Sequence, residues 1–391
     1  MTFEISHEQR LLVDTVRDFI KNELAPLEQE IEETGTLSDK VAQAIFEKSS
    51  ALGLYGMNIP EQYGGGGLSC LDQIMCEEQF GHTTDILIRR AFGNVYEVLL
   101  SCEGAQIDRW LTPAVKGERV CSIAFTEPGA GSDAAGIKTK AVRRGDTWVL
   151  SGMKHYISDG AFSDFFVVTA VTDPDKGHRG ISMFMVDKGM PGFSLGRDQQ
   201  MMGIRGTSHL DLHFDEVELT DEHLLGREGE GLKLALSVLG RVRLAQVAAR
   251  AVGKSTKILQ MTLDHARDRH QFGQPLGDFQ MVQQMLADSA MEINATRMAL
   301  WQCAADIDAG RDPRANISAL KVQGAELLGR VVDRAVQIFG GMGYSKDLPI
   351  ERYYRDARIY RIFDGASEVH RSVVARALLK GSTELFDPWS A

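Results

Sequence analysis

Apolar residues recur at helical spacing in the first third of the chain. Between residues 11 and 24 they fall three or four positions apart, with acids and bases between them, which predicts an amphipathic helix. Similar stretches predict helices at 38–52, 68–81, 85–100 and 105–115. Ser38 is the expected N-cap of the second helix, because a serine oxygen accepts a hydrogen bond from the first helical turn. Residues 1–119 are therefore predicted to form an all-α domain.

The pattern changes at Val120, where short runs rich in β-forming residues replace the helical spacing. These runs are separated by clusters of Gly, Pro and Asp, which is the pattern of antiparallel strands. The runs lie at 121–125, 147–150, 164–171, 181–186 and 209–214. Residues 120–226 are therefore predicted to form a small β domain between helical regions.

Long helices return from Gly229 onward. The stretch 314–339 is apolar on more than one face, so this helix is expected to be buried on several sides. A core within one chain and a bundle shared with a second copy both fit that pattern. The fold class is thus an α+β multidomain protein, with an all-α domain at 1–119, an antiparallel β domain at 120–226 and a C-terminal four-helix bundle at 227–391.

Composition narrows the function. Of 391 residues, 43% are apolar and 25% charged, which is ordinary for a soluble protein, and the net charge of −11 disfavours nucleic-acid binding. No apolar run is long enough to span a membrane. The five cysteines have no CxxC spacing, so no metal site is expected. With no recognisable signal peptide, they fit a reducing compartment, the cytoplasm.

A carboxylate stands between the last two predicted helices. The first ends after Arg361, the chain breaks at Asp364-Gly365, and an apolar helix then runs to Leu379. Asp-Gly is a common turn dipeptide, so a plain turn is one interpretation. The other is a functional one, because a carboxylate at such a break can face a cleft.

Five motifs in order carry a resemblance to a known family. The stretch AFTEPGAGSD at 124–133 closely resembles the flavin- and substrate-binding signature of the acyl-CoA dehydrogenase family. The segments at 203–208, 224–226, 269–273 and 337–343 resemble further motifs of that family in the same order. Since the resemblance covers essentially the whole chain, the sequence is identified as a member. It implies an FAD cofactor, an acyl-CoA substrate, an electron-transfer flavoprotein as electron acceptor and a homotetramer.

The resemblance assigns cofactor contacts residue by residue. These are Phe125, Thr126, Gly131, Ser132, Tyr156, Ser158, Arg269, Phe272, Gln280, Gln337, Gly341, Ser367 and Glu368. Tyr156 and Ser158 replace the family's commoner Trp and Thr but keep an aromatic face and a hydroxyl. By resemblance, Arg269 and Phe272 reach the FAD of a neighbouring subunit. Ala366 departs from the usual Thr, which removes one hydroxyl contact.

The family reaction implies a catalytic base. The base removes the α-proton of an acyl-CoA, the β-hydrogen goes to flavin N5, and a trans-2-enoyl-CoA forms. The usual base is a Glu where this chain has Asp364, which is shorter by about 1.5 Å. Some relatives carry the base near 241–244 instead, but this chain has no carboxylate there. Asp as the base has precedents in relatives that act on cyclic acyl-CoAs and in nitroalkane oxidase.

Substrate contacts are expected at Ser132, Gly365, Arg241, Arg243 and Arg89. A family Arg falls on Leu244 here, so Arg241 and Arg243 are the nearby candidates. Arg89 and Arg90 lie on the helix that lines the distal acyl pocket in relatives, which suggests a polar or carboxylated acyl tail. A surface pair of cations is the alternative. The other function classes that stay open are an acyl-CoA oxidase, a nitroalkane-oxidase-like enzyme and a non-catalytic CoA- or FAD-binding protein.

Overall fold

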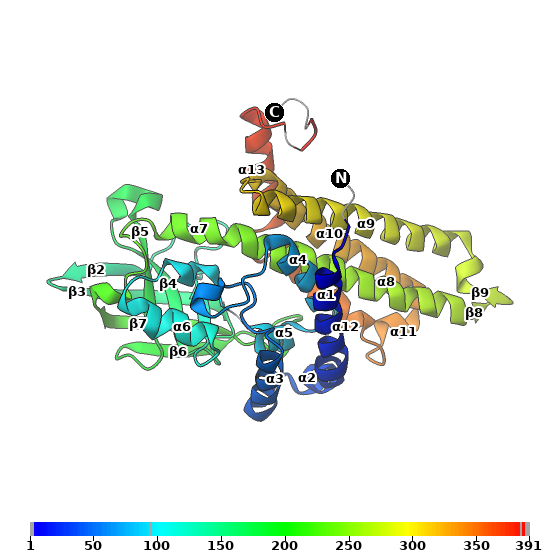
Figure 1. The fold of residues 1–391 in the computed structure, drawn as a ribbon, viewed down its shortest axis with the longest axis horizontal. Coiled ribbons are helices and arrows are strands. Elements are labelled where there is room, and N and C mark those ends of the chain that lie inside the picture. The colour runs from blue at the N-terminus through cyan, green and yellow to red at the C-terminus, as the bar shows by residue number, and fades with distance from the viewer. Residues whose placement is uncertain (1–3, 94, 384, 388–391) are drawn as a thin grey trace.

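The structure is a computed structural model that describes residues 4–93, 95–383 and 385–387, without the side chains of residues 238–239 and 242–243. The β domain lies at one end, and long helices run from it across the molecule to a small hairpin at the opposite end (Figure 1). The N-terminal helices pack beside the middle of these long helices. This three-part arrangement confirms the predicted fold class.

The N-terminal domain is helical, as predicted. Ser38 Oγ accepts a hydrogen bond from the Val41 amide at 3.4 Å, which confirms the predicted N-cap. The predicted helix at 85–100 is wrong as one piece, because Gly93 adopts a φ of +87° and ends it. The helices are α1 His7–Phe19, α2 Glu28–Thr34, α3 Asp39–Ala51, α4 Cys70–Phe80, α5 Asp85–Phe92 and α6 Thr112–Val115, with π turns at Ile20–Leu24 and Ile107–Leu111 and 3-10 turns at Ala25–Leu27, Glu61–Tyr63 and Glu97–Ser101.

The middle domain is one seven-stranded sheet. Its strands are β1 Cys121–Ala124, β2 Lys140–Arg144, β3 Thr147–Ser158, β4 Phe165–Val171, β5 Ile181–Asp187, β6 Phe193–Asp198 and β7 His209–Leu219. Their order is β1-β4-β2-β3-β7-β6, and β5 pairs with β4. The expectation of antiparallel pairing is wrong for β1, which runs parallel to β4. Strands β2 and β6 were not predicted, since they are short and largely exposed.

The C-terminal domain is built on long helices. Helices α7 Gly231–Val242 and α8 Arg250–Asp268 join through a π-helical segment, Arg243–Ala249. The other elements are the strands β8 His270–Gln271 and β9 Gln274–Pro275, a 3-10 turn Leu276–Asp278, α9 Gln280–Asp308, α10 Arg314–Phe339, α11 Gly341–Tyr344, α12 Ile350–Arg358, a 3-10 turn Ile359–Arg361 and α13 Ser367–Leu379. The bounds predicted for α10 and for the end of α13 are confirmed.

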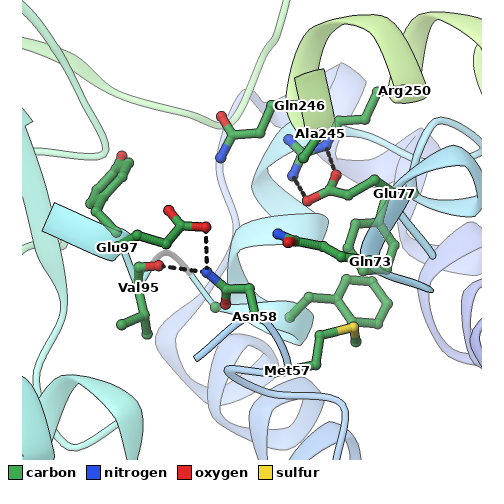
Figure 2. A pocket seen from close by; sticks show the side chains of 13 residues that line it. Met57, Asn58, Gln73, Glu77, Val95, Glu97, Ala245, Gln246 and Arg250 are labelled. Atoms are coloured by element: carbon green, nitrogen blue, oxygen red, sulfur yellow. Dashed lines mark hydrogen bonds and ion pairs between the residues drawn. The ribbon is translucent and has the colours of Figure 1, made fainter. Parts of the chain in front are cut away.

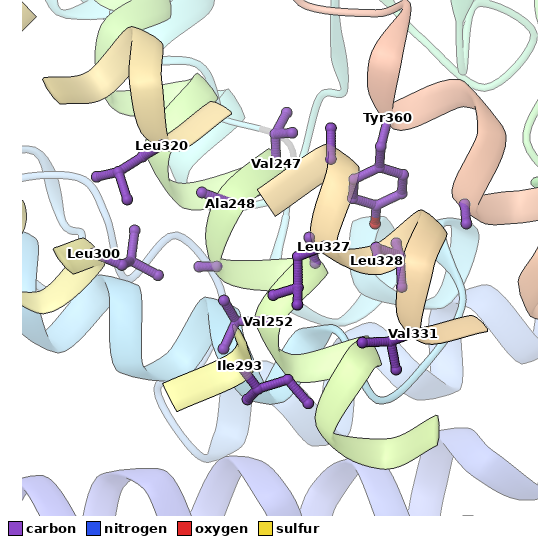
Figure 3. Close-up of a cluster of buried hydrophobic side chains, with 14 of the residues drawn as sticks. Val247, Ala248, Val252, Ile293, Leu300, Leu320, Leu327, Leu328, Val331 and Tyr360 are labelled. Carbon is purple, nitrogen blue, oxygen red and sulfur yellow. The ribbon is translucent and has the colours of Figure 1, made fainter. Parts of the chain in front are cut away.

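Helix α10 is the centre of the largest core. Leu320, Leu327 and Leu328 of α10 are almost fully buried against residues of α8, α9 and the π-helical segment (Figure 3). The expectation that this helix is buried on several sides is therefore confirmed. Tyr360 belongs to the same cluster, although it lies after α12 in the chain.

All five cysteines are buried, and none forms a disulfide within the described residues. Within the described ranges, no three His, Cys, Asp or Glu side chains are grouped so that they could hold a metal ion. None of the helices described is long and apolar enough to cross a membrane.

Candidate active site

The turn at Asp364 has a constrained backbone. Asp364 adopts a φ of +52° and Gly365 a φ of +87°, and α13 begins directly afterwards. Left-handed backbone is uncommon outside glycine, but Asp tolerates it better than most residues. His370 Nε2 lies 3.0 Å from the carbonyl oxygen of Asp364, and a Cβ on Gly365 would lie 2.8 Å from the same nitrogen. The break predicted from the sequence is therefore a tight turn that only a small residue after Asp364 permits.

Tyr360 anchors the segment that leads into this turn. Its side chain is 7% exposed and belongs to the same buried cluster as Leu328 and Val331 of α10 (Figure 3). Burial raises the pKa of its hydroxyl group. Burying an aromatic side chain of this size contributes about 2 kcal/mol to stability. Asp364, four residues later, is thus presented from a segment fixed to the main core.

The β domain brings Thr126, Tyr156 and Ser158 together. The backbone carbonyl of Thr126 accepts a hydrogen bond from the amide of His155 at 2.8 Å. An irregularity in β3 gives Tyr156 a φ of +58° and leaves its side chain 49% exposed. Ser158 Oγ lies 3.1 Å from Nδ1 of His209 on β7. Such a distortion at the end of a strand re-aims side chains, as bulges beside active sites do.

The loop after Thr126 is fixed by a buried ion pair. Lys154 is fully buried and donates to Glu127 Oε1 at 2.8 Å and to the carbonyl oxygen of Phe125 at 3.1 Å. Gly131 and Ser132 are exposed, and a Cβ on Gly131 would meet nothing within 4 Å. The loop is thus rigid at its base and open on its outer side. Sequence reasoning missed Lys154, because an alternating strand pattern gives no signal for a buried cation.

A second group of predicted residues lies far from the β domain. Arg269 and Phe272 flank β8 in the hairpin at the opposite end of the molecule (Figure 1). Phe272 is 95% exposed, and Arg269 is exposed as well. The stacking of His265 on Phe339 at 4.2 Å brings the end of α8 to the end of α10, where Gln337 and Gly341 are exposed. Gln280, at the start of α9, is also exposed.

One chain therefore does not bring all the predicted cofactor residues together. The first group lies in the β domain, and Ser367 and Glu368 follow the turn at Asp364. Glu368 is exposed, whereas Ser367 is 1% exposed. The Ser367 hydroxyl oxygen makes no hydrogen bond within the part of the chain that the structure describes.

Arg90 is buried and Arg89 is 15% exposed, so the surface-pair alternative is wrong. Arg90 is 6% exposed and donates to Asp159 at 2.8 Å, and its guanidinium lies 3.6 Å from the ring centre of Phe162. Arg89 donates through Nε to Asp85 at 2.6 Å. Its Nη1 is buried and has no hydrogen-bond partner among the described residues.

Arg89 is the end of a largely buried chain of charges. Glu77 accepts from Arg250 Nε at 2.5 Å, and Asp85 lies between Arg250 and Arg89. Burial alone would raise the pKa of Asp85, but Arg89 and Arg250 outweigh it and lower the pKa to about 2. Sequence reasoning missed Glu77, Asp85 and Arg250. The i,i+4 spacing of Asp85 and Arg89 was a readable signal, whereas Glu77 and Arg250 are too distant in sequence to give one.

A polar cavity adjoins this network. It has a volume of about 40 Å³, enough for a few water-sized groups, and lies between α4 and the π-helical segment (Figure 2). Asn58 donates to Glu97 Oε1 at 3.2 Å and to the carbonyl oxygen of Val95 at 3.1 Å. The polar residues that line the cavity are Asn58, Gln73, Glu77, Tyr96, Glu97, Gln246 and Arg250.

Arg241 faces a different neighbour. It lies beside the thiol of Cys70, whose pKa burial raises to about 11, and its own Nε is buried without a hydrogen-bond partner among the described residues. Asp308 accepts from the backbone amide of Cys70 at 2.6 Å, so Arg241 lies near the start of α4 and the end of α9. The side chain of Arg243 lies outside the described residues.

Comparison with known proteins identifies the fold. Family models for the acyl-CoA dehydrogenase N-terminal, middle and C-terminal domains match residues 6–118, 122–217 and 229–379. This chain belongs to the acyl-CoA dehydrogenase family. The short-chain specific acyl-CoA dehydrogenase of Clostridium acetobutylicum is 34% identical over 385 residues, which cover 97% of this chain and 100% of the relative.

Two further relatives extend the comparison. The caffeyl-CoA reductase-Etf complex subunit CarC of Acetobacterium woodii is 33% identical over 386 residues, which cover 96% of this chain and 99% of the relative. The structure of the glutaryl-coenzyme A dehydrogenase glutaryl-CoA complex is 29% identical, covers 98% of each chain and has a TM-score of 0.89. The expected identity as a flavoprotein oxidoreductase is confirmed.

FAD is the cofactor of this acyl-CoA dehydrogenase fold, and the residues present fit it. Open backbone at Gly131 and Gly341 allows close approach of a planar or phosphate-bearing ligand, because no side chain occupies the space a Cβ would fill. The buried hydroxyl of Ser367 offers a hydrogen-bond donor. Arg269 offers a guanidinium fork, which suits a pyrophosphate.

Proposed function

We propose that the chain dehydrogenates an acyl-CoA thioester to a 2-enoyl-CoA, with Asp364 as the base that removes the α-proton. The observation that carries this proposal is the turn at Asp364, where a carboxylate leaves the helical core on a constrained, half-buried backbone. FAD, when bound, supplies the acceptor at flavin N5 for the hydrogen that leaves the β-carbon. Open backbone at Gly131 and the exposed ring of Tyr156 support the β domain as the flavin-facing side.

The shorter base makes placement critical. Asp364 reaches about 1.5 Å less far than a glutamate on the same backbone. A misplacement of about 1 Å costs roughly 100-fold in rate, so either the turn or the substrate must lie closer. The anchoring of Tyr360 and the contact between His370 and Asp364 restrict movement of the turn. We therefore infer a substrate that differs from a plain straight-chain acyl-CoA.

The polar surroundings of Arg89 support an acyl group with a carboxylated tail. Arg89 Nη1 is a buried donor without a partner among the described residues, and leaving such a donor unpaired is costly. A carboxylate is the acceptor that a guanidinium binds best. Asp85 links Arg89 to Arg250, which lines the polar cavity, and a hydrocarbon tail gains little beside these groups.

The exposed hairpin end supports a homotetramer with shared cofactor sites. Arg269 and Phe272 lie at the opposite end from the β domain of their own chain, so a neighbouring subunit is the FAD site they could complete (Figure 1). The relative named as a subunit of an Etf complex supports an electron-transfer flavoprotein as the electron acceptor.

An anaerobic flavin-bleaching screen tests the proposal. The purified yellow holoenzyme is mixed with straight, branched, cyclic and dicarboxylic acyl-CoA esters, and the loss of flavin absorbance is followed. We expect fast bleaching by a dicarboxylic or cyclic ester and slow bleaching by butyryl-CoA. Reduction only by a nitroalkane would replace the proposal with a nitroalkane-oxidase-like function, for which an aspartate base is the supporting observation. A colourless protein, or one that no compound reduces, would indicate a non-catalytic member.

Rapid reoxidation by dissolved oxygen distinguishes an oxidase from a dehydrogenase. A dehydrogenase should be reoxidised slowly by oxygen and quickly by an electron-transfer flavoprotein.

A further inference from the structure

The geometry points to a clamp, formed by the loop 202–207, that sets the distance between Asp364 and the flavin-facing strands. In this clamp Asp356 is a positioning residue, since it touches neither substrate nor cofactor in the proposed site. The inference rests on the proposed function, because it concerns the placement of the proposed base.

The loop holds α12 through the side chain of Asp356. The backbone amide of Ile204 donates to Asp356 Oδ1 at 2.6 Å. Gly203 packs against the same helix so closely that a Cβ there would lie 2.6 Å from Asp356 Oδ1 and 2.9 Å from the Asp356 nitrogen. Only glycine fits at this contact without displacing the loop or the helix.

Backbone strain marks the contact as enforced. Ile204 has a φ of +57°, although left-handed backbone is strongly disfavoured for a β-branched residue. Such conformations persist where surrounding contacts determine them, and they cluster at functional sites. Releasing the bond to Asp356 should therefore let Ile204 relax and move the loop.

Neighbouring residues attach both ends of the loop. Arg355 donates to the carbonyl oxygen of Met202 at 3.3 Å and to Glu32 of α2 at 2.6 Å. Thr207 Oγ1 donates to Asp85 at 3.3 Å. The loop is thus attached to α12 on one side and to α2 and α5 of the N-terminal domain on the other.

Beyond Thr207 the loop passes directly into the strands of the proposed site. The carbonyl oxygen of Ser208 accepts from the amide of Asp159 at 2.7 Å, and the following residue, His209, contacts Ser158. In the other direction, Asp356 precedes Asp364 by two turns of chain that include the buried Tyr360. One loop therefore connects the strand that bears Ser158 with the segment that bears the base.

The side chain of Asp356 is a buried acceptor with three cations near it. It is 7% exposed, and the cations facing it are Lys254 of α8 and its helix neighbours Arg352 and Arg355. Lys254 itself donates to the carbonyl oxygen of Thr83 at 3.1 Å. The cations near this acceptor therefore come from one other helix, α8, and from α12 itself.

Single-turnover kinetics test the clamp in the holoenzyme. We expect Asp356→Ala to slow anaerobic flavin reduction about 10- to 100-fold, with KM and FAD content within twofold of wild type. Asp356→Asn keeps an acceptor oxygen and should restore most of the rate. Gly203→Ala should repeat the loss through a new Cβ, which keeps the test valid if Asp356→Ala fails to fold. Asp333→Asn, an exposed carboxylate on α10, is the matched control.

Hydrogen exchange of the peptide that contains Ile204 separates the clamp from the proposed function. The clamp predicts a slowly exchanging Ile204 amide in wild type and a fast one in Asp356→Ala. Equal exchange in both proteins, or wild-type reduction by Asp356→Ala, would overturn the clamp. A rate loss fully explained by lost FAD or a raised KM would also overturn it, because it would show a docking role only. If no acyl-CoA reduces wild type, the proposed function fails and the exchange rates alone decide the clamp.

Discussion

The turn at Asp364 and the hairpin end, which comprises β8, β9 and the exposed Phe272, are built in opposite ways. The turn follows the buried Tyr360, and His370 Nε2 lies 3.0 Å from the Asp364 carbonyl oxygen. At the hairpin end, Phe272 is 95% exposed and Tyr344 85% exposed. Exposed apolar side chains of this size gathered at one end mark an interaction surface. For the proposed function, the difference predicts that one chain supplies the acid–base side of the site and that a neighbouring subunit completes its dinucleotide side.

Removing the proposed base should have the largest effect on the rate of flavin reduction. We expect Asp364→Asn to bind acyl-CoA and lose flavin reduction about 1,000-fold, since a positioned general base contributes about 100- to 10,000-fold. Stopped-flow absorbance with the best ester from the screen measures this, with Asp333→Asn as control. Reduction at the wild-type rate would place the base elsewhere.

Arg89 tests whether the enzyme prefers acyl groups with a carboxylated tail. Removing a charge-assisted hydrogen bond costs about 1.5–3 kcal/mol, so Arg89→Ala should lower the preference for dicarboxylic over monocarboxylic esters about 10- to 100-fold. The ratio of kcat/KM values for a matched pair of esters is the measurement. Arg89→Lys keeps the charge but not the fork and should fall between. An unchanged ratio in Arg89→Ala would exclude a carboxylate contact.

Arg269 tests whether the exposed hairpin end contributes to FAD binding. We expect Arg269→Ala to weaken FAD retention about 10-fold while the isolated chain stays folded, because the side chain makes no ion pair within the described part of the chain. Flavin absorbance after dilution and gel filtration gives the retention. Arg267→Ala, on the exposed end of α8 with its partner Asp264, is the control. Equal retention in both variants would remove Arg269 from the cofactor site.

Asp85 should affect stability and not the reaction, with a defined pH dependence. Its folded pKa of about 2 lies below its ordinary value of 3.8, so its stabilisation is present above pH 3.8 and lost as the pH falls toward 2. This corresponds to about 2 kcal/mol in the free energy of unfolding. Urea unfolding should show Asp85→Asn less stable than wild type at pH 7, with the difference shrinking toward pH 3. A constant difference would mean that the Asp85 charge is not what stabilises the fold.

The sequence predicted the bounds of those elements that end at nearby Pro or Gly residues. Pro313 and Gly340 flank α10, so its bounds were predictable. Asp364-Gly365 likewise indicated the turn before α13. Gly93 interrupts a continuous helical pattern, and only its positive φ ends α5. The parallel pairing of β1 with β4 depends on the path of the whole sheet, which no local pattern records.

The site was predictable as separate motifs and not as an assembly. The sequence draws attention to Arg89 and Arg90, but their pairing depends on Asp85 and on Asp159, which lies 69 residues from Arg90. Glu77 and Arg250 are paired across 173 residues, so only the fold brings them together. Arg269 is likewise far from Tyr156 because α7, the π-helical segment and α8 together extend from the β domain to the hairpin.

The five buried cysteines allow local unfolding to be followed by thiol labelling. Cys76 lies in α4 and Cys102 directly after the 3-10 turn Glu97–Ser101, both in the N-terminal domain. Cys121 lies in β1 and Cys303 in α9, so each of the three regions carries at least one. Burial raises the pKa of each thiol, to about 12 for Cys102 and Cys303. In the native state the thiols are therefore both inaccessible and protonated, and alkylating reagents should not label them. Mass-resolved labelling in rising urea would therefore rank the order in which the three regions come apart, without any introduced probe.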